Sequence, residues 1–357
     1  MALPAPNEII IEGRSIRVRG LVQGVGFRPT VWKIARKCGL EGDVLNDGAG
    51  VRIRAWGSTS DLDMFLQQLK EQAPPLSRID SIEWEDLTSP FPEQGFHIVA
   101  SEGGHVETGI VPDASICTAC QDEISNPQNP RYRYPFTNCT HCGPRLSIVQ
   151  ALPYDRDHTS MAGFQMCPSC QGEYDDPSDR RFHAQPNSCP DCGPQAWLEN
   201  ADGDRLDVSG FRDAVDAAAT FIRAGKIVAI KGIGGFHLAC DAGNEDAVVM
   251  LRQRKHRYGK PLALMARDLE MASGYVSINA MERDALIGSE SPIVVLERKK
   301  RGLSLASGVA PGQTCLGFML PYTPLHLVLM ADMQRPIVLT SGNRSEEPQV
   351  TENGEAL

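Results

Sequence analysis

The sequence has few features of a membrane or secreted protein. Among its 357 residues, no apolar run approaches the roughly 18 residues that a membrane-spanning helix needs. The start, MALPAPNEII, lacks the basic residues and the apolar stretch of a secretory signal peptide. The sequence therefore predicts a cytoplasmic protein without a membrane segment.

Positive charge is also in deficit. The chain has 35 lysines and arginines against 45 aspartates and glutamates, and its formal net charge is −10. A general nucleic-acid binder needs a basic surface that neutralises phosphates, so nucleic acid is not expected as a partner. Apolar residues make up 41% of the chain, which is enough for sizeable cores. The length predicts two or three domains.

Cysteine is present in an ordered pattern. Eight of the 11 cysteines form four CxxC pairs between residues 117 and 192, while Cys38, Cys240 and Cys315 are scattered. Without an export signal, this spacing predicts metal binding and not disulfides. Two CxxC pairs supply the four thiolates of a tetrahedral zinc site. We therefore expect two zinc ions, held by Cys117, Cys120, Cys139 and Cys142 and by Cys167, Cys170, Cys189 and Cys192.

These cysteines belong to an internal duplication. CTACQDEISNPQNPRYRYPFTNCTHCGP begins at residue 117, and CPSCQGEYDDPSDRRFHAQPNSCPDCGP begins at residue 167. Two copies of one small unit are expected, although the spacing leaves open whether the repeats exchange CxxC pairs. Four cysteines leave a zinc ion no position for substrate, so both ions would be structural. The arginines of this region are either nucleic-acid contacts or structural residues: Arg131, Arg133, Arg145, Arg180 and Arg181.

The first hundred residues alternate between strand and helix patterns. Strands are expected over residues 9–22, over 42–57 as a pair joined by an Asn-Asp-Gly turn, over 79–87 and over 95–100. Helices are expected over residues 29–40 and 61–72. The order βαββαβ is that of the ferredoxin-like fold.

A glycine-rich loop, VQGVGFRP, follows the first strand. Glycines between a strand and a helix let the backbone N–H groups turn inward and form an anion cradle. Arg28 at its mouth offers a planar fork for two phosphate oxygens. Asn46, at the end of the next strand, could accept from a water and donate to a developing oxyanion. The alternative is a plain glycine-rich turn with a solvated arginine.

The combination of VRGLVQGVGFRP with GxVxNxxxGVxIxAxG closely resembles the acylphosphatase family over residues 8–98. The resemblance implies that Arg28 binds phosphate and that Asn46 orients the attacking water. It also implies that the cradle is lined by the backbone amides of Gln23, Gly24, Val25, Gly26 and Phe27.

The chain from residue 206 returns to strands and helices and is expected to be mixed α/β. Helices are predicted over residues 211–225 and 323–333, and strands over 226–232, 291–298 and 335–348; residues 245–266 pass from helix through a loop to a strand. That loop is the most basic stretch of the chain, which suits a polyphosphate. A solvated basic helix end is the alternative.

Four segments of this part resemble the YrdC-type ATP-dependent carbamoyl-adenylate domain: KIVAIKGIGGFHLACDA, KHRYGKPLALM, LPYTPLHLVL and LTSGNRSEEP. In that family a K-x-R-P motif grips the triphosphate, and here Tyr258 replaces its proline, which would loosen the loop. The resemblance implies that the triphosphate is bound by Lys255, Arg257 and Lys260. It also implies that Thr340, Ser341 and Asn343 lie near the nucleotide, and that Lys231 and His237 lie on the substrate side.

The order of these parts resembles the N-terminal part of the HypF family, the carbamoyltransferases of NiFe-hydrogenase maturation. The resemblance implies an acylphosphatase-like domain over 1–100, a tandem four-cysteine zinc-finger domain over 101–205 and a YrdC-like nucleotide-binding domain over 206–357. The last domain is expected to be incomplete, because the chain stops at TENGEAL.

The same resemblance implies the chemistry. Carbamoyl phosphate would be hydrolysed to carbamate and phosphate, and ATP with Mg²⁺ would convert carbamate to carbamoyl-adenylate and pyrophosphate. A domain beyond this sequence would pass the carbamoyl group to the C-terminal cysteine of HypE, on the way to the cyanide ligands of the NiFe site. The alternatives are an O-carbamoyltransferase acting on a small molecule, a zinc-stabilised RNA-binding protein, and a scaffold with an inert acylphosphatase domain.

Overall fold

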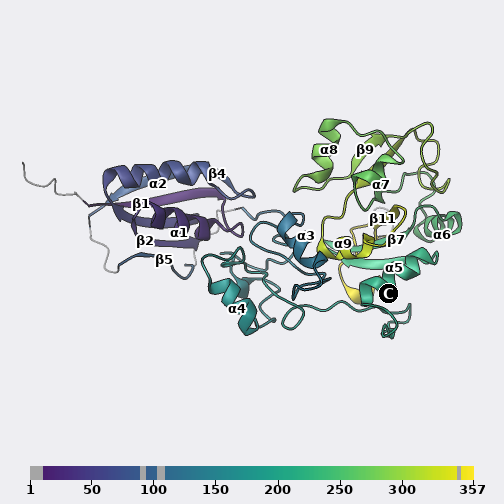
Figure 1. Cartoon of the computed structure of the whole chain (residues 1–357), viewed down its shortest axis with the longest axis horizontal. Helices are drawn as coiled ribbons and strands as arrows, with labels where there is room; N and C mark the ends of the chain where they lie inside the picture. Colours follow the sequence, from purple (N-terminus) through teal and green to yellow (C-terminus); the bar gives the residue numbers. More distant parts are fainter. Residues whose placement is uncertain (1–10, 89–93, 103–108, 344–346) are drawn as a thin grey trace, which may run out of the picture. The chain divides into compact units, whose positions relative to one another are not determined.

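The computed structural model describes residues 11–88, 94–102, 109–343 and 347–357. By its contacts the chain divides into two compact units. The first comprises residues 1–112 and 138–187, and the second comprises residues 113–137 and 188–357. Each contains one β-sheet, of five strands in the first unit and six in the second (Figure 1). Among the described helices, none is both long and apolar enough to cross a membrane.

The sheet of the first unit has the strand order β4-β1-β3-β2-β5. The strands are β1 (Glu12–Leu21), β2 (Glu41–Asp47), β3 (Gly50–Gly57), β4 (Arg78–Leu87) and β5 (Phe96–Ile98). The first four pair antiparallel, and β5 adds to the edge in parallel with β2. Helix α1 (Phe27–Lys37) follows β1, and α2 (Thr59–Glu71) follows β3. The predicted ferredoxin-like order is confirmed, although residues 9 and 10 of the first predicted strand lie outside the described residues.

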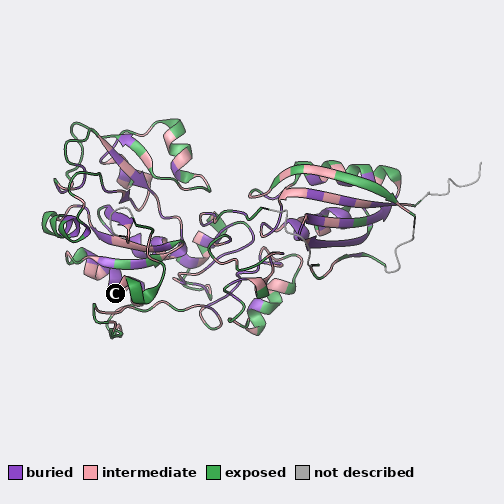
Figure 2. Cartoon of the chain, turned by 180° about the vertical axis from the view of Figure 1, so that it is seen from behind, coloured by how far each residue is buried: buried purple, intermediate pink, exposed green. Residues whose placement is uncertain are grey.

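Alternation along the strands builds the core of this unit. Ile16 and Val18 of β1 are fully buried, whereas Arg17 between them is only partly covered. Helix α2 buries Leu62, Phe65 and Leu69 against the same core, as its apolar stripe predicts, while Leu66 is partly buried there. Burying each such side chain contributes about 1.5–3 kcal/mol. Figure 2 shows the central strands mostly buried and the outer surface of α2 exposed.

Residues 138–187 complete the first unit. They contain the short helices η1 (Arg156–His158) and α4 (Pro168–Asp175). Much of their backbone is tied by arginine side chains: Arg156 donates to the carbonyls of Asn187 at 3.0 Å and Phe164 at 2.6 Å. Trp32 of α1 packs edge-on against Phe182 of this segment, with ring centroids 5.9 Å apart. The segment is therefore part of the same packed body as the ferredoxin-like sheet.

The sheet of the second unit has the order β6-β7-β11-β8-β10-β9. The strands are β6 (Val228–Gly232), β7 (Gly235–Asp241), β8 (Leu264–Met265), β9 (Val294–Glu297), β10 (Cys315–Met319) and β11 (Ile337–Ser341). Neighbours pair antiparallel except β8 and β10, which are parallel. The helices are α3 (Thr118–Ser125), α5 (Ala214–Arg223), α6 (Glu245–Lys255), α7 (Leu269–Ser273), α8 (Ala280–Ile287), α9 (Pro324–Met330) and α10 (Asn353–Ala356).

Local sequence explains where several of these helices begin. Asp213 caps α5 and Asn244 caps α6, in each case by accepting from a backbone N–H three residues later. Helix α8 has a complete capping box between Asn279 and Glu282. The mixed α/β class is confirmed. Strands β7 and β10 were not predicted, because neither shows a clean alternation of apolar and polar residues.

Candidate functional site

The glycine-rich loop between β1 and α1 needs glycine at two positions. Gly24 and Gly26 have φ angles of 75° and 76°, in the left-handed region that disfavours side chains. A Cβ atom added at Gly24 would lie 3.1 Å from the ring of Tyr154. A Cβ atom at Gly26 would lie 3.0 Å from Cβ of Thr140. Conformation and close packing together therefore favour glycine at both positions.

A small pocket lies over this loop, entirely within the first unit. Its volume is about 20 Å³, which is room for about one water. Arg28 and Asn46, the two predicted catalytic residues, both line it. The other polar and glycine residues of the lining come from the loop and from the segment 138–187: Gly24, Gly26, Thr140, Arg145, Tyr154, His183 and Gln185.

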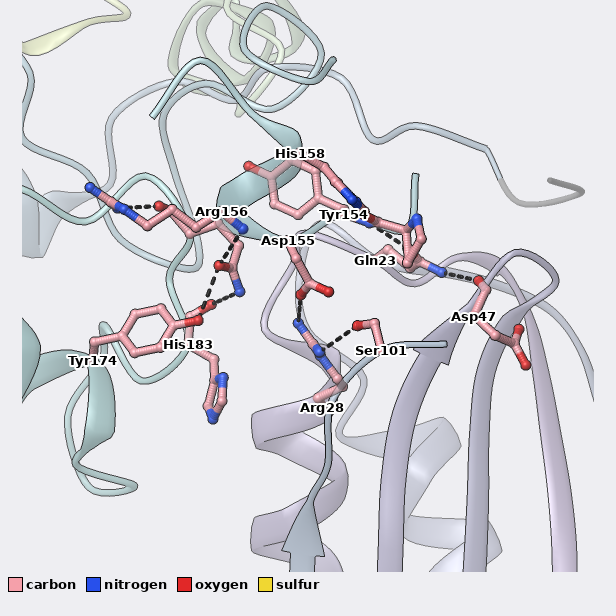
Figure 3. A network of polar contacts seen from close by, with 12 residues as sticks. Gln23, Arg28, Asp47, Ser101, Tyr154, Asp155, Arg156, His158, Tyr174 and His183 are labelled. Carbon is pink, nitrogen blue, oxygen red and sulfur yellow. Dashed lines mark hydrogen bonds and ion pairs between the residues drawn. The ribbon is translucent and has the colours of Figure 1, made fainter. Parts of the chain in front are cut away.

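Arg28, in the first turn of α1, is buried and held by two partners. One guanidinium nitrogen pairs with Oδ1 of Asp155 at 2.8 Å, and the other donates to Oγ of Ser101 at 3.1 Å (Figure 3). Its side chain is 9% exposed. The arginine is therefore not the solvated side chain of the alternative interpretation.

Asn46 lies at the end of β2 and is 2% exposed. Its Oδ1 is buried and has no hydrogen-bond partner among the described residues. A buried acceptor without a partner costs about 1–3 kcal/mol, and such atoms in native proteins often mark functional sites. An acceptor in this position fits a water molecule in the pocket.

Gln23 ties the loop to its surroundings. Its Nε2 donates to the carbonyls of Asp47 at 2.8 Å and Gly50 at 2.9 Å, and its Oε1 accepts from the backbone N–H of Tyr154 at 3.0 Å. Val25 and Phe27 turn their side chains into the core. Of the predicted cradle residues, these three therefore use their side chains for structure, and only their backbones are available to a ligand.

His183 lines the same pocket from the second cysteine repeat. Burial, reinforced by the positive charge of Arg28, lowers the pKa of His183 to about 4. Its ring packs against Tyr174 and Phe182, with centroids 5.0 Å and 4.6 Å away. At neutral pH this histidine is therefore uncharged, chiefly because it is buried.

The eight paired cysteines gather into two clusters. In each cluster the sulfur atoms lie within 4.8 Å of one another, and each cluster takes its four cysteines from one repeat. This grouping answers the question of exchange that the spacing left open. A tetrahedral zinc with Zn–S bonds of about 2.3 Å sets sulfur atoms about 3.8 Å apart. The measured Sγ–Sγ distances are 3.8 Å for Cys139–Cys142 and 3.7 Å for Cys189–Cys192, so both clusters fit zinc.

The two repeats exchange arginine contacts. Nε of Arg131 donates to the carbonyl of Ser188 at 2.9 Å, and Nε of the equivalent Arg181 donates to the carbonyl of Asn138 at 3.0 Å. Each acceptor directly precedes the third cysteine of the other repeat. Arg145 donates to the carbonyls of Cys139, Thr140 and Cys142 and to that of Gly24. These buried contacts support the structural interpretation of Arg131, Arg145 and Arg181 over the nucleic-acid one.

A larger pocket of about 500 Å³ lies in the second unit. Four of the predicted nucleotide-site residues line it: His237, Arg257, Thr340 and Ser341. Arg257 donates to Oγ1 of Thr340 at 3.3 Å. Ser289, Ser291 and Tyr322 also line the pocket, and none of these was predicted from the sequence.

Lys255 is buried at the end of α6 and contacts the loop after β11. Its Nζ donates to the carbonyl oxygen and Oδ1 of Asn343, both at 2.9 Å, and to the carbonyl of Ser341 at 2.5 Å. Burial and the charge of Arg257 lower the pKa of Lys255, and burial lowers the pKa of His237.

The two other predicted lysines lie elsewhere. Lys231 is exposed and donates to Oδ1 of Asn353 at 2.8 Å, and Lys260 is exposed. Neither is part of the pocket lining. The structure thus brings together six of the eight predicted residues at or next to the pocket.

Comparison with known proteins finds three family matches along the chain. Residues 14–98 match the family described as Acylphosphatase, residues 116–149 and 166–199 match the HypF finger, and residues 220–357 match the Sua5, YciO and YrdC family described as Telomere recombination. The first part is also 47% identical over 72 residues to an acylphosphatase of Mannheimia succiniciproducens, covering 79% of that protein.

Longer relatives match nearly the whole chain. The chain is 52% identical over 341 residues to carbamoyltransferase HypF of Rhodobacter capsulatus and 49% identical over 357 residues to carbamoyltransferase HypF2 of Cupriavidus necator. Each alignment covers 96% of this chain but 44% of the relative, so the chain spans less than half the length of these proteins.

Solved structures give the same result. A full-length HypF in the phosphate- and nucleotide-bound form matches with a TM-score of 0.90 and 46% identity, over 98% of this chain and 45% of that one. HypF of T. kodakarensis matches with a TM-score of 0.87 and 40% identity, over 97% and 44%. With the acylphosphatase, finger and YrdC parts all present in one chain, this protein belongs to the HypF carbamoyltransferase family.

Proposed function

We propose that this chain carries out the first steps of a carbamoyl transfer. In the first unit, carbamoyl phosphate is hydrolysed to carbamate and phosphate. In the second, carbamate attacks the α-phosphate of ATP and gives carbamoyl-adenylate and pyrophosphate. The observation that carries the proposal is that Arg28 and Asn46 line one pocket over the glycine loop, where Oδ1 of Asn46 has no hydrogen-bond partner among the described residues.

The residues of the first site have separable roles in this proposal. Arg28 binds two oxygens of the phosphoryl group, assisted by the backbone amides of residues 23–27. Asn46 accepts a hydrogen bond from the attacking water through Oδ1 and thereby orients it. No group of strongly basic character is required, because an acyl phosphate has a good leaving group and the site supplies position and charge. The buried surroundings strengthen both contacts.

The second site would bind ATP. Arg257 and Lys255 offer positive charge to the phosphates, together with Lys260 if its loop closes over the nucleotide. Thr340, Ser341 and Asn343 offer hydroxyl and amide groups next to them, while Lys231 and His237 would serve the carbamate side. Mg²⁺ with the ATP would neutralise charge on the pyrophosphate that leaves. The nucleotide in the related full-length HypF structure supports this assignment.

The organisation proposed for the chain is an acylphosphatase-like domain over 1–100, a zinc-finger domain over 101–205 and a YrdC-like domain over 206–357. Zinc in the two cysteine clusters would be structural, since four thiolates complete its coordination. Transfer of the carbamoyl group to the C-terminal cysteine of HypE, in NiFe-hydrogenase maturation, would need the part of the longer relatives that this chain does not match.

The test is phosphate release from carbamoyl phosphate by the wild type and by Arg28→Ala. Removing a preorganised charge that binds the reacting group lowers kcat by about 10²–10³, so a fall of that order is expected. The matched control is Lys33→Ala, which removes one positive charge at an exposed position of the same helix and should leave the rate unchanged. Equal rates for wild type and Arg28→Ala would refute the assignment of this site.

A further inference from the structure

The partner of Arg28 comes from outside the acylphosphatase part of the chain. Asp155 lies 127 positions after Arg28 and beyond the residues 14–98 that match the acylphosphatase family. It belongs to the stretch between the two cysteine repeats, next to η1. The chain therefore places a carboxylate on the arginine that is proposed to bind an anionic substrate.

The backbone on both sides of Asp155 is held firmly. The N–H of Tyr154 donates to Oε1 of Gln23 at 3.0 Å, and the N–H of Arg156 donates to Oε1 of Gln185 at 2.9 Å. His158 and the carbonyl of Pro153 lie in hydrogen-bond contact at 2.7 Å. The Asp155 side chain, in contrast, is 29% exposed and bonds to Arg28 (Figure 3). If Asp155 moves, we therefore expect its side chain to change rotamer while the backbone of the segment stays in place.

Such a change is required for substrate to bind. The present pocket has room for about one water, which is far less than carbamoyl phosphate needs. A phosphoryl group that takes the guanidinium of Arg28 must displace the Asp155 carboxylate, since both are anions that compete for the same nitrogens. The displaced carboxylate remains close to the bound ligand because its backbone is held.

Gln185 is the other pocket residue with a side-chain amide, and its oxygen already accepts two hydrogen bonds. Oε1 of Gln185 accepts from the N–H of Arg156 and from the hydroxyl of Tyr174, the latter at 3.1 Å. The hydroxyl of Thr140 donates a hydrogen bond to the carbonyl of Arg180 at 3.0 Å. Asp155, once released from Arg28, has up to four lone-pair sites, and its carboxylate has no other donor among the residues that the structure describes. It would be stabilised by a ligand that brings an N–H group to it.

We propose, on the basis of the function proposed above, that Asp155 is a specificity-determining residue that accepts a hydrogen bond from the carbamoyl NH₂ group. Carbamoyl phosphate carries both an anion for Arg28 and an N–H donor for Asp155. Acetyl phosphate has the same phosphoryl group but a methyl group in place of the amine, so it displaces the carboxylate without giving it a new partner. A site that hydrogen-bonds a substrate group rejects the analogue that lacks it.

The experiment compares phosphate release from carbamoyl phosphate and from acetyl phosphate by the wild type, Asp155→Ala and Asp155→Asn. In Asp155→Ala, kcat/KM for carbamoyl phosphate should fall relative to that for acetyl phosphate by about tenfold or more, as expected for loss of a hydrogen bond to a charged group. Asp155→Asn keeps an acceptor oxygen without the charge, and its ratio should lie between the other two. Asp157→Ala, an exposed aspartate two residues later, is the matched control and should keep the wild-type ratio.

The outcomes are distinct. A change of both substrates by the same factor would mean that Asp155 only competes with phosphate, and the specificity role would be wrong. Failure of the wild type to hydrolyse either substrate would refute the proposed function itself and the inference with it. Zinc content and melting temperature check the fold, and if Asp155→Ala does not fold, the ratio measured for Asp155→Asn decides.

Discussion

Nζ of Lys255 donates hydrogen bonds to both the backbone oxygen and the side-chain oxygen of Asn343, and both N–O distances are 2.9 Å. The two residues are 88 positions apart, so this contact joins the end of α6 to the loop after β11. Both residues were predicted to lie at the nucleotide. Their contact shows that the basic end of α6 is not simply a solvated helix end, because Lys255 is buried and donates to oxygen atoms of the loop after β11.

The first prediction concerns ATP. Lys255→Met keeps most of the apolar stem and removes the ammonium group, so the affinity for ATP should fall by about tenfold or more, the loss typical of a charge-assisted hydrogen bond. Calorimetric titration with ATP and Mg²⁺ measures it. Arg254→Met is the control, since Arg254 is exposed one residue earlier on the same helix. ATP affinity equal to that of the wild type, with a lowered melting temperature, would show that Lys255 only holds the loop.

The second prediction links the first cysteine cluster to the proposed acyl-phosphate site. The carbonyl of Cys139 accepts from Arg145 at 2.9 Å, and Arg145 also donates to the carbonyl of Gly24 in the cradle. Cys139→Ser should remove one of the two bound zinc ions and loosen this contact, because metal binding and local folding are coupled. We expect the zinc content to fall by half and phosphate release from carbamoyl phosphate to fall at least tenfold.

The control for this prediction is Cys315→Ser, at a cysteine outside both clusters. It should keep both zinc ions, as measured by atomic emission, and the wild-type rate. If Cys139→Ser lost its zinc but hydrolysed carbamoyl phosphate at the wild-type rate, the cluster and the cradle would be independent, and Arg145 would be no more than a local support.

Features that depend on residues close together in the sequence could be predicted. The glycines of the cradle follow from the φ angles that they adopt, and the order of strands and helices in the first unit follows from the apolar periodicity. The CxxC spacing predicted the eight cysteine ligands, but the structure was needed to show which pairs share a cluster. Arg28 and Asn46 could be found because a glycine loop after a strand and a polar residue at the end of the next strand are both visible along the chain.

Contacts between distant segments could not be predicted in this way. Asp155 meets Arg28 only because residues 138–187 fold against the ferredoxin-like sheet, and no periodicity or spacing in its own segment points to that partner. The same holds for the reciprocal bonds of Arg131 and Arg181, which look like exposed basic residues in the sequence and are buried in the structure. Lys260 shows the converse, as a predicted ligand that lies exposed.

The last prediction concerns the stability of the first unit below neutral pH. The unfolded chain protonates His183 near its ordinary pKa of about 6.5, whereas burial and Arg28 lower the pKa in the folded protein to about 4. Between these values the unfolded state binds a proton that the folded state does not, so the free energy of unfolding falls as the pH drops from about 6.5 to 4. Above pH 6.5 the group contributes no pH dependence.

The variant that tests this is His183→Asn. It removes the titrating ring and tolerates the positive φ of 55° at this position, because asparagine is enriched in the left-handed region. Urea unfolding at several pH values from 7 to 4.5 should show a smaller loss of stability for the variant than for the wild type. Any loss of zinc at low pH affects both proteins equally and cancels in this comparison. The control is His97→Asn, the same replacement at an exposed histidine of the same unit. Parallel stability curves for the wild type and His183→Asn would mean that the histidine is protonated as readily in the folded protein as in the unfolded chain, and that the pocket around Arg28 is open to water.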